Sequence, residues 1–252
     1  MLDQPLILLA LSFLALWLSA EAGAYFQTKH GNLKEVIRED LGTILAAALT
    51  LLGLIIGFSF SMAVERYDER KNYEEAEANA IGTEYVRASL LPPADAAKVR
   101  GLLKSYVNLR IQFYTMRGAD RLNEINVFTE RLQADLWSAV QTPAAVQPTP
   151  LAALAVSGMN DVLNSQGYAQ AAWWNRIPLA AWALMEAIAI CCNLLSGYVL
   201  RLKRRKIDPF VILPLLVSIS FYLIAELDSP RGGFVRVSPQ NLISLHRSFS
   251  AP

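Results

Sequence analysis

The sequence has few of the residues on which soluble enzymes rely. Its two cysteines, Cys191 and Cys192, are neighbours inside an apolar run. Adjacent residues of a helix point about 100° apart, so a disulfide between them is implausible. Its two histidines, His30 and His246, are too few and too scattered for a metal cluster. None of the motifs GxxxxGK[ST], HExxH or GxSxG occurs. We therefore expect no enzyme, no cofactor and no metal.

Charge is also scarce. Charged residues make up 18% of the chain, against about 25% in soluble domains. Hydrophobic residues make up 54%, and the mean hydropathy is +0.30. A net charge of +1 gives no overall field that would recruit nucleic acid. This composition indicates a membrane protein with a polar domain, and it makes the lipid bilayer the expected partner.

Four apolar runs are long enough to cross a hydrocarbon core of about 30 Å. The first ends in a pattern like a signal-peptidase site, but the preceding MLDQP has no basic residue, so we expect a membrane helix. The expected spans are Leu6–Phe26, Leu41 to about Ala63, Pro178–Leu200 and Pro209–Leu227.

The second span continues into a charged segment without any proline. We therefore expect one unbroken helix from Asp40 to Leu90. Residues 91–176 show further helical patterns, with an N-cap expected at Asp120 and a linker at Thr142–Pro150. The predicted fold class is an all-α integral membrane protein with four transmembrane helices and a helical extramembrane domain inserted between spans two and three. Its expected parts are residues 1–63, 64–176, 177–228 and 229–252.

Basic residues gather in the two expected short loops. The five-residue N-terminal tail has none, although Arg66, Arg70 and Lys71 follow span two. By the positive-inside rule we expect the loops in the cytoplasm of a bacterial inner membrane, with the helical domain and both termini outside. The basic loop residues are Lys29, Lys34, Arg38, Arg201, Lys203, Arg204, Arg205 and Lys206.

Small residues recur along span two. One interpretation is close helix packing, which such residues permit in lipid. The other is a face lining a pore, with an apolar constriction that gates by dewetting. The candidate pore-lining residues are Thr50, Gly53, Ile56, Gly57, Phe60, Ser61, Glu65 and Asp68.

The charged segment after span two pairs opposite signs four residues apart, as in Arg70 with Glu74 and Lys71 with Glu75. We expect a solvated, self-paired helix surface. The alternative is a set of charged rings around an oligomer axis, formed by Glu65 or Asp68.

Two further stretches carry unusual polar residues. Glu186 and Asn193 lie inside span three, where a carboxylate must face other helices or water. An interhelical hydrogen bond is one role for Glu186, and ion conduction is the other. After span four, a tight turn is expected at residues 229–233, with Ser238 as the N-cap of a short amphipathic helix.

The stretches GFSFSMAVERYDERKNYEEAEANAIGTEYVRASLLP and LDSPRGGFVRVSP resemble the bestrophin-like family of bacterial membrane proteins. The LD-x-P-x-x-G turn motif is Leu227, Asp228, Pro230 and Gly233, with Arg231 where we would expect an aromatic residue. The resemblance covers most of the chain. It implies similarity to bestrophins, which are oligomeric anion channels whose second span lines the pore and whose helical bulk is cytosolic.

The leading hypothesis is therefore a homo-oligomeric channel for inorganic ions, with span two lining the pore. The alternative is a non-conducting membrane scaffold or envelope sensor whose helical domain binds a partner.

Overall fold

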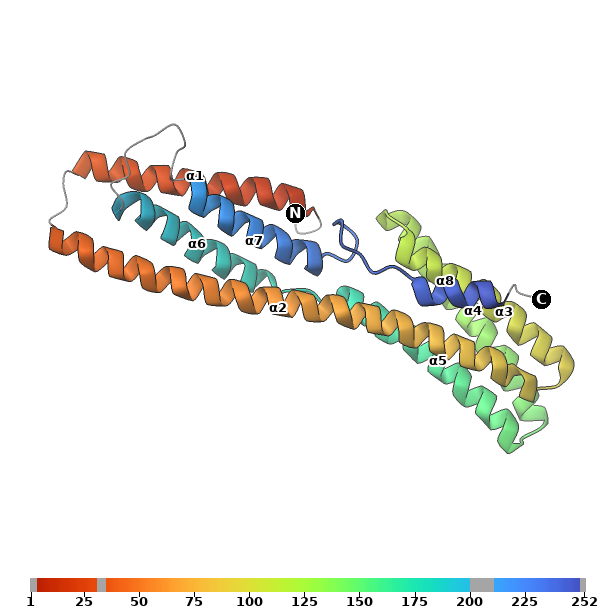
Figure 1. Ribbon diagram of the computed structural model, residues 1–252. Helices are drawn as coiled ribbons and strands as arrows, with labels where there is room; N and C mark the ends of the chain where they lie inside the picture. Colours follow the sequence, from red (N-terminus) through yellow and green to blue (C-terminus); the bar gives the residue numbers. More distant parts are fainter. Residues whose placement is uncertain (1–3, 31–34, 200–210, 250–252) are drawn as a thin grey trace. The chain divides into compact units, whose positions relative to one another are not determined.

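The computed structural model describes residues 4–30, 35–199 and 211–249, and every regular element in these ranges is a helix (Figure 1). The all-α prediction is confirmed for this part of the chain. In chain order the elements are α1 (Pro5–His30), α2 (Glu35–Arg87), the 3-10 turn η1 (Ala88–Leu90), α3 (Pro93–Thr115), α4 (Ala119–Val146), α5 (Pro150–Trp174), α6 (Leu179–Val199), α7 (Ile212–Asp228) and α8 (Gln240–Ser248).

Three described helical stretches are long and apolar enough to cross a membrane: Pro5–Lys29, Val36–Leu90 and Pro150–Val199. The predicted unbroken helix is confirmed, because α2 runs for 53 residues and leads directly into η1. The basic segment 201–206 and Pro209 lie outside the described residues.

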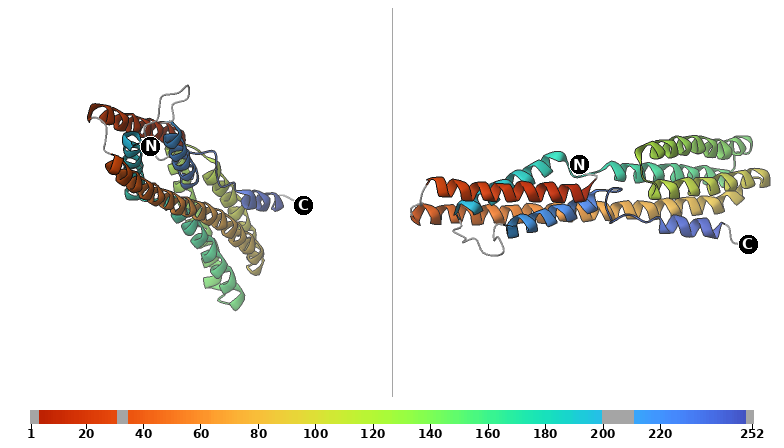
Figure 2. Two further views of the ribbon diagram at one scale, coloured as in Figure 1. Left: turned by 60° about the vertical axis from the view of Figure 1, so that its left-hand side comes forward. Right: turned by 90° about the horizontal axis from the view of Figure 1, so that it is seen from above.

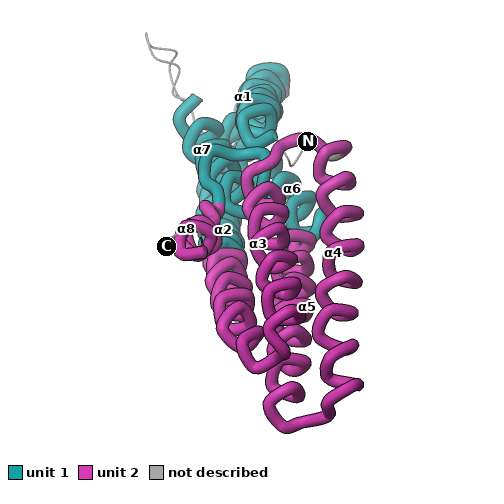
Figure 3. The backbone as a smooth tube through the Cα atoms, turned by 90° about the vertical axis from the view of Figure 1, so that its right-hand side faces the viewer, with its two compact units in different colours: residues 1–67, 176–236 teal, residues 68–175, 237–252 magenta. Residues whose placement is uncertain are grey.

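The chain divides into two compact units (Figure 3). We call residues 1–67 and 176–236 the membrane unit, and residues 68–175 and 237–252 the bundle unit. The helix α2 contributes to both. The C-terminal helix α8 belongs to the bundle unit, although it begins 172 positions after the start of that unit in the sequence (68 to 240).

In the membrane unit, α1, α6 and α7 lie side by side (Figure 2). Their closest approach is between α1 and α6, where Gly23 and Gly197 face the partner helix. A Cβ on Gly23 would collide with the carbonyl of Leu194, and one on Gly197 would collide with the carbonyl of Ala20. The surrounding core includes Leu16, Leu52, Met185, Cys192 and Phe221.

In the bundle unit, α3, α4, α5 and the second half of α2 surround an apolar core. Its fully buried members include Ile81, Leu103, Phe113, Leu136 and Met159. Helices α3 and α5 both begin with proline in the first turn, where its missing N–H costs nothing. Thr149 also caps α5, because its hydroxyl accepts a hydrogen bond from Ala152 N at 3.1 Å.

Several predicted boundaries were wrong, mostly because helices continue further than turn residues suggest. The helices α1 and α2 extend into the expected loop between spans one and two. The predicted linker shrinks to residues 147–149, because α4 continues through Pro143 to Val146.

Two predicted N-caps were also wrong. Gly118 takes the N-cap position of α4 with a φ of 100°, which favours glycine, and Asp120 lies in the first turn. At α8 the N-cap position is Pro239 rather than Ser238.

Candidate functional site

The membrane half of α2 presents three different faces. Leu45, Leu52 and Ala63 form a buried stripe against the membrane-unit core. By helix geometry, a second face carries small or polar residues together with Phe60, and a third carries large apolar residues. The exposed members of the second face are Ala46, Thr50, Gly53, Gly57, Phe60 and Ser61; those of the third are Ile44, Leu51, Leu54, Phe58 and Met62.

Most of the predicted pore-lining residues therefore share one uncovered face of α2. No described atom lies within 4 Å of a Cβ built on Gly53 or Gly57, so these glycines serve no close packing within the described chain. The hydroxyl of Thr50 donates to the carbonyl of Ala46 at 2.9 Å and needs no other partner. Ile56 differs, because it packs partly against the membrane-unit core.

Of the two candidate charges, Asp68 continues this face by helix geometry, and Glu65 lies beside it toward the large apolar face; both are exposed. Between them, Arg66 turns inward and pairs with Asp228, with 3.4 Å between Nη1 and Oδ1. Asp228 is nearly buried and also accepts hydrogen bonds from Ile177 N at 3.0 and 3.3 Å. One carboxylate thus joins α2, the segment before α6 and the end of α7. We call this the Asp228 clasp.

The turn after α7 is stabilised by hydrogen bonds to the carboxylate of Glu226. Glu226 accepts hydrogen bonds from Phe234 N at 2.7 Å and Val235 N at 3.3 Å. Its carboxylate lies against Gly233, where a Cβ would collide with it. The hydroxyl of Ser229 accepts from Gly232 N at 3.1 Å. The predicted turn at residues 229–233 is confirmed, and it explains the glycine of the motif.

In the bundle unit, two charged side chains on α2 form hydrogen bonds with groups at the ends of other helices. Arg70 donates to the carbonyls of Ala172 at 3.1 Å and Asn175 at 3.3 Å, at the C-terminus of α5. Glu74 accepts from Leu242 N at 3.0 Å and from the amide of Asn241 at 2.7 Å, at the N-terminus of α8. Each sign matches the helix dipole it meets. Burial raises the pKa of Glu74, although these hydrogen bonds oppose the shift.

A buried ion pair joins α2 to α3. Glu77 accepts hydrogen bonds from Arg110 and, at 3.2 Å, from the hydroxyl of Tyr114. Glu77 and Arg110 are fully buried, and the Arg110 guanidinium lies 4.3 Å from the centre of the Phe113 ring. Burial and the Glu77 carboxylate raise the pKa of Tyr114, so its phenol stays protonated and continues to donate.

The prediction of a solvated charged surface is therefore wrong for Arg70, Glu74 and Glu77. Their burial follows the spacing of the buried residues along α2. The buried stripe continues at spacings of three, four or seven residues through both halves of the helix: Leu45, Leu52, Ser59, Ala63, Arg70, Glu74, Glu77, Ile81, Glu84 and Ala88.

Within the membrane unit, Glu186 forms the interhelical hydrogen bond proposed as one of its roles. The hydroxyl of Ser12 on α1 donates to Glu186 Oε2 on α6 at 3.2 Å. Asn193 is fully buried, and its amide donates to the carbonyl of Ala189 at 2.8 Å. The two residues contact different partners, so no polar path joins them through these bonds.

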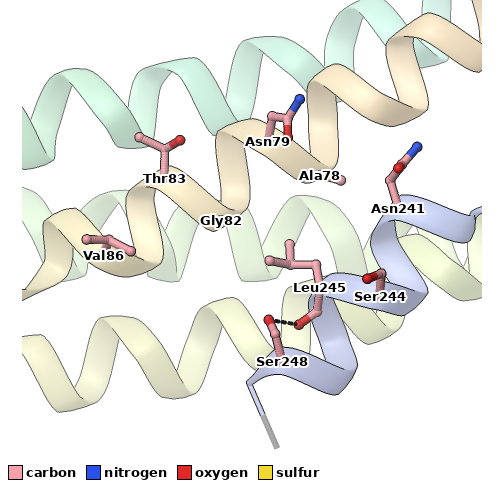
Figure 4. A pocket seen from close by; sticks show the side chains of 9 residues that line it. All are labelled: Ala78, Asn79, Gly82, Thr83, Val86, Asn241, Ser244, Leu245 and Ser248. Carbon is pink, nitrogen blue, oxygen red and sulfur yellow. Dashed lines mark hydrogen bonds between the residues drawn. The ribbon is translucent and has the colours of Figure 1, made fainter. Parts of the chain in front are cut away.

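A groove of about 490 Å³ runs between α2 and α8 in the bundle unit (Figure 4). Leu245 points toward Gly82, where a Cβ would lie 3.1 Å from Leu245 Cδ1. Beyond these residues the lining is small and mostly polar: Ala78, Asn79, Thr83, Val86, Asn241, Ser244 and Ser248. Among the described residues, no group of three or more potential metal ligands occurs here or elsewhere.

Comparison with known proteins agrees with this architecture. The Bestrophin-like domain matches residues 7–242, whereas a comparison with curated protein sequences finds no significant match. Crystal structures of a bacterial bestrophin homologue from Klebsiella pneumoniae are similar in fold. One, a point variant, superposes with a TM-score of 0.65 at 15% identity and covers 97% of this chain and 95% of its own. Another superposes with a TM-score of 0.60 at 15% identity and covers 97% of this chain and 96% of its own. A point variant of a membrane protein superposes with a TM-score of 0.65 at 15% identity and covers 97% of this chain and 96% of its own. The chain therefore belongs to the Bestrophin-like family.

Proposed function

We propose that the chain forms a homo-oligomeric ion channel in a bacterial inner membrane, with the small-residue face of α2 turned toward the central axis. Anions are the ions that the likeness to bestrophins favours. The observation that carries the proposal is the uncovered face at Thr50, Gly53 and Gly57. Contact with lipid stabilises a face of small and polar residues little, whereas a pore axis or a second subunit can accommodate such a face.

The proposal includes four spans. Helix α7 has 17 residues, and its length of about 25 Å approaches the thickness of a hydrocarbon core. The charge bias of the loops supports a cytoplasmic position for them, with the bundle unit outside. A reporter fused at Pro252 tests this orientation: activity of a reporter that functions only in the cytoplasm would reverse it.

Reconstitution of the purified protein into planar bilayers tests conduction. We expect ionic currents and an oligomer in detergent. A monomer, or the absence of current over a range of voltage, pH and ions, would overturn the channel and leave a non-conducting scaffold whose bundle unit binds a partner.

The role of the exposed acids is tested separately by ion selectivity. We expect Glu65→Gln and Asp68→Asn to shift the reversal potential in a salt gradient, because Asp68 is a charge at the end of the pore-lining face and Glu65 is a charge beside that end. Glu124→Gln is the matched control, since Glu124 is an exposed acid on α4. An unchanged reversal potential in both variants would place Glu65 and Asp68 outside the ion pathway.

A further inference from the structure

Glu84 is a buried acid that the channel proposal does not use. It lies on the buried stripe of α2 and is fully enclosed. Its carboxylate presses against α5 at Gly158, where a Cβ would collide with Glu84 Oε2. Neither carboxylate oxygen has a hydrogen-bond partner among residues 4–30, 35–199 and 211–249. An ionised carboxylate without partners is costly to bury, so this site favours the neutral acid.

Two charged side chains act on Glu84: Arg87 from α2 and Asp161 from α5. Arg87 Nη1 lies 3.7 Å from Asp161 Oδ2 and joins the two helices. The Arg87 side chain also crosses Gly158, where a Cβ would lie 2.7 Å from Nη1. The guanidinium and the Glu84 carboxyl therefore lie against the same glycine. Burial raises the pKa of Glu84 to about 8, with Arg87 opposing the shift and Asp161 adding to it.

We propose that Glu84 is a proton-binding site, and that its proton decides which acid Arg87 pairs with. When Glu84 is neutral, Arg87 binds Asp161 and holds α2 against α5. When the proton leaves for water, the new carboxylate attracts Arg87 from three residues further along the same helix. Arg87 then releases Asp161, and the α2–α5 contact at Gly158 loosens. This inference does not depend on conduction.

Infrared difference spectroscopy of the whole protein in detergent tests the proton site. Between acidic and alkaline samples, the wild type should lose a carboxylic-acid C=O band with a midpoint near pH 8. The band should be missing in Glu84→Gln, whose amide is neutral at every pH, and retained in Glu124→Gln. A wild type that loses no such band near this pH, or an unchanged band in Glu84→Gln, would overturn the proposal. The wild-type measurement stands even if a variant does not fold.

The exchange of partners is tested by Asp161→Asn and by hydrogen exchange. Asp161→Asn should lower the midpoint, because it removes a charge that opposes ionisation and frees Arg87. Rate-corrected amide exchange of α5 around Gly158 should rise several-fold above the midpoint in the wild type and stay flat in Glu84→Gln. Exchange that is equal on both sides of the midpoint, or a midpoint that is unmoved in Asp161→Asn, would overturn the exchange of partners.

Discussion

At the scale of single residues, the bundle unit contains buried charged side chains whose partners lie on other helices. Arg70, Glu74 and Glu77 each meet a partner more than 30 positions away in the sequence. An ionic side chain becomes tolerable inside a protein only when its partners replace the water it loses. Arg70 achieves this with carbonyls at the end of α5, Glu74 with Leu242 N and the side-chain amide of Asn241 at the start of α8, and Glu77 with Arg110 and Tyr114.

Breaking the Glu77–Arg110 pair should be costly. We expect Glu77→Gln to lower the free energy of unfolding of the bundle unit by about 3–5 kcal/mol, because Arg110 would remain buried and charged. Urea unfolding followed by tryptophan fluorescence measures this, since Trp173 contacts Phe113 and Tyr114. Glu124→Gln should change little.

A double replacement completes this test. Glu77→Met combined with Arg110→Leu removes both charges and should cost less than Glu77→Gln alone. If the single replacement proves no worse than the exposed control, the buried pair does not stabilise the bundle unit.

These partners explain what the sequence could not predict. The helical periodicity of α2 and the prolines that begin α3 and α5 are local signals, so the helices were predictable. The partners of Arg70 and Glu74 are mainly backbone groups at the ends of α5 and α8, with the side-chain amide of Asn241 as the exception, and no side-chain motif marks backbone groups. The turn at Gly233 was predictable as a turn. Its cause, the Glu226 carboxylate lying where a Cβ would be, appears only in three dimensions.

At the scale of elements, the glycines of the membrane unit separate into two kinds. Gly23 and Gly197 lie where α1 and α6 approach backbone to backbone. Gly53 and Gly57 lie on a face of α2 that no described residue covers. The second pair has a regular spacing of four residues within one helix, which is a local signal in the sequence. The first pair, on two helices far apart in the chain, carries the close packing.

This difference gives a matched comparison. Gly197→Ala should destabilise the protein by about 1–3 kcal/mol, because its methyl group would force α1 and α6 apart. Gly57→Ala should leave thermal stability nearly unchanged, since its methyl group meets open space. Thermal unfolding in detergent measures both. Equal losses in the two variants would show that the α1–α6 approach is not as tight as described, or that Gly57 packs against another subunit.

At the scale of the whole molecule, stability should depend on pH with a definite sign. Burial raises the pKa of Glu74 and of Glu84 above their ordinary value of 4.5, the latter to about 8. Both acids therefore hold a proton more tightly in the folded chain than in the unfolded chain. Their stabilising contribution is complete below about pH 4.5 and is lost as the pH rises through the folded pKa values.

We therefore expect the melting temperature of the wild type to fall between about pH 5 and about pH 8. Differential scanning calorimetry in detergent measures it. Glu84→Gln should flatten most of the slope, because an amide does not titrate. A melting temperature that rises over this interval in the wild type would contradict the prediction.

The Asp228 clasp has a consequence for how the protein is made. It joins Arg66, Ile177 and Asp228, and the ribosome synthesises these residues in that order with most of the chain between the first and the last. Residues 68–175 of the bundle unit lie between Arg66 and Ile177, so α3, α4 and α5 leave the ribosome before the clasp can close, whereas α8 follows Asp228. Until residue 228 has been synthesised, Arg66 lacks this carboxylate as a partner. The membrane unit is therefore completed late in biosynthesis, and a chain that stops short of α7 leaves Arg66 and Ile177 without the group that joins them.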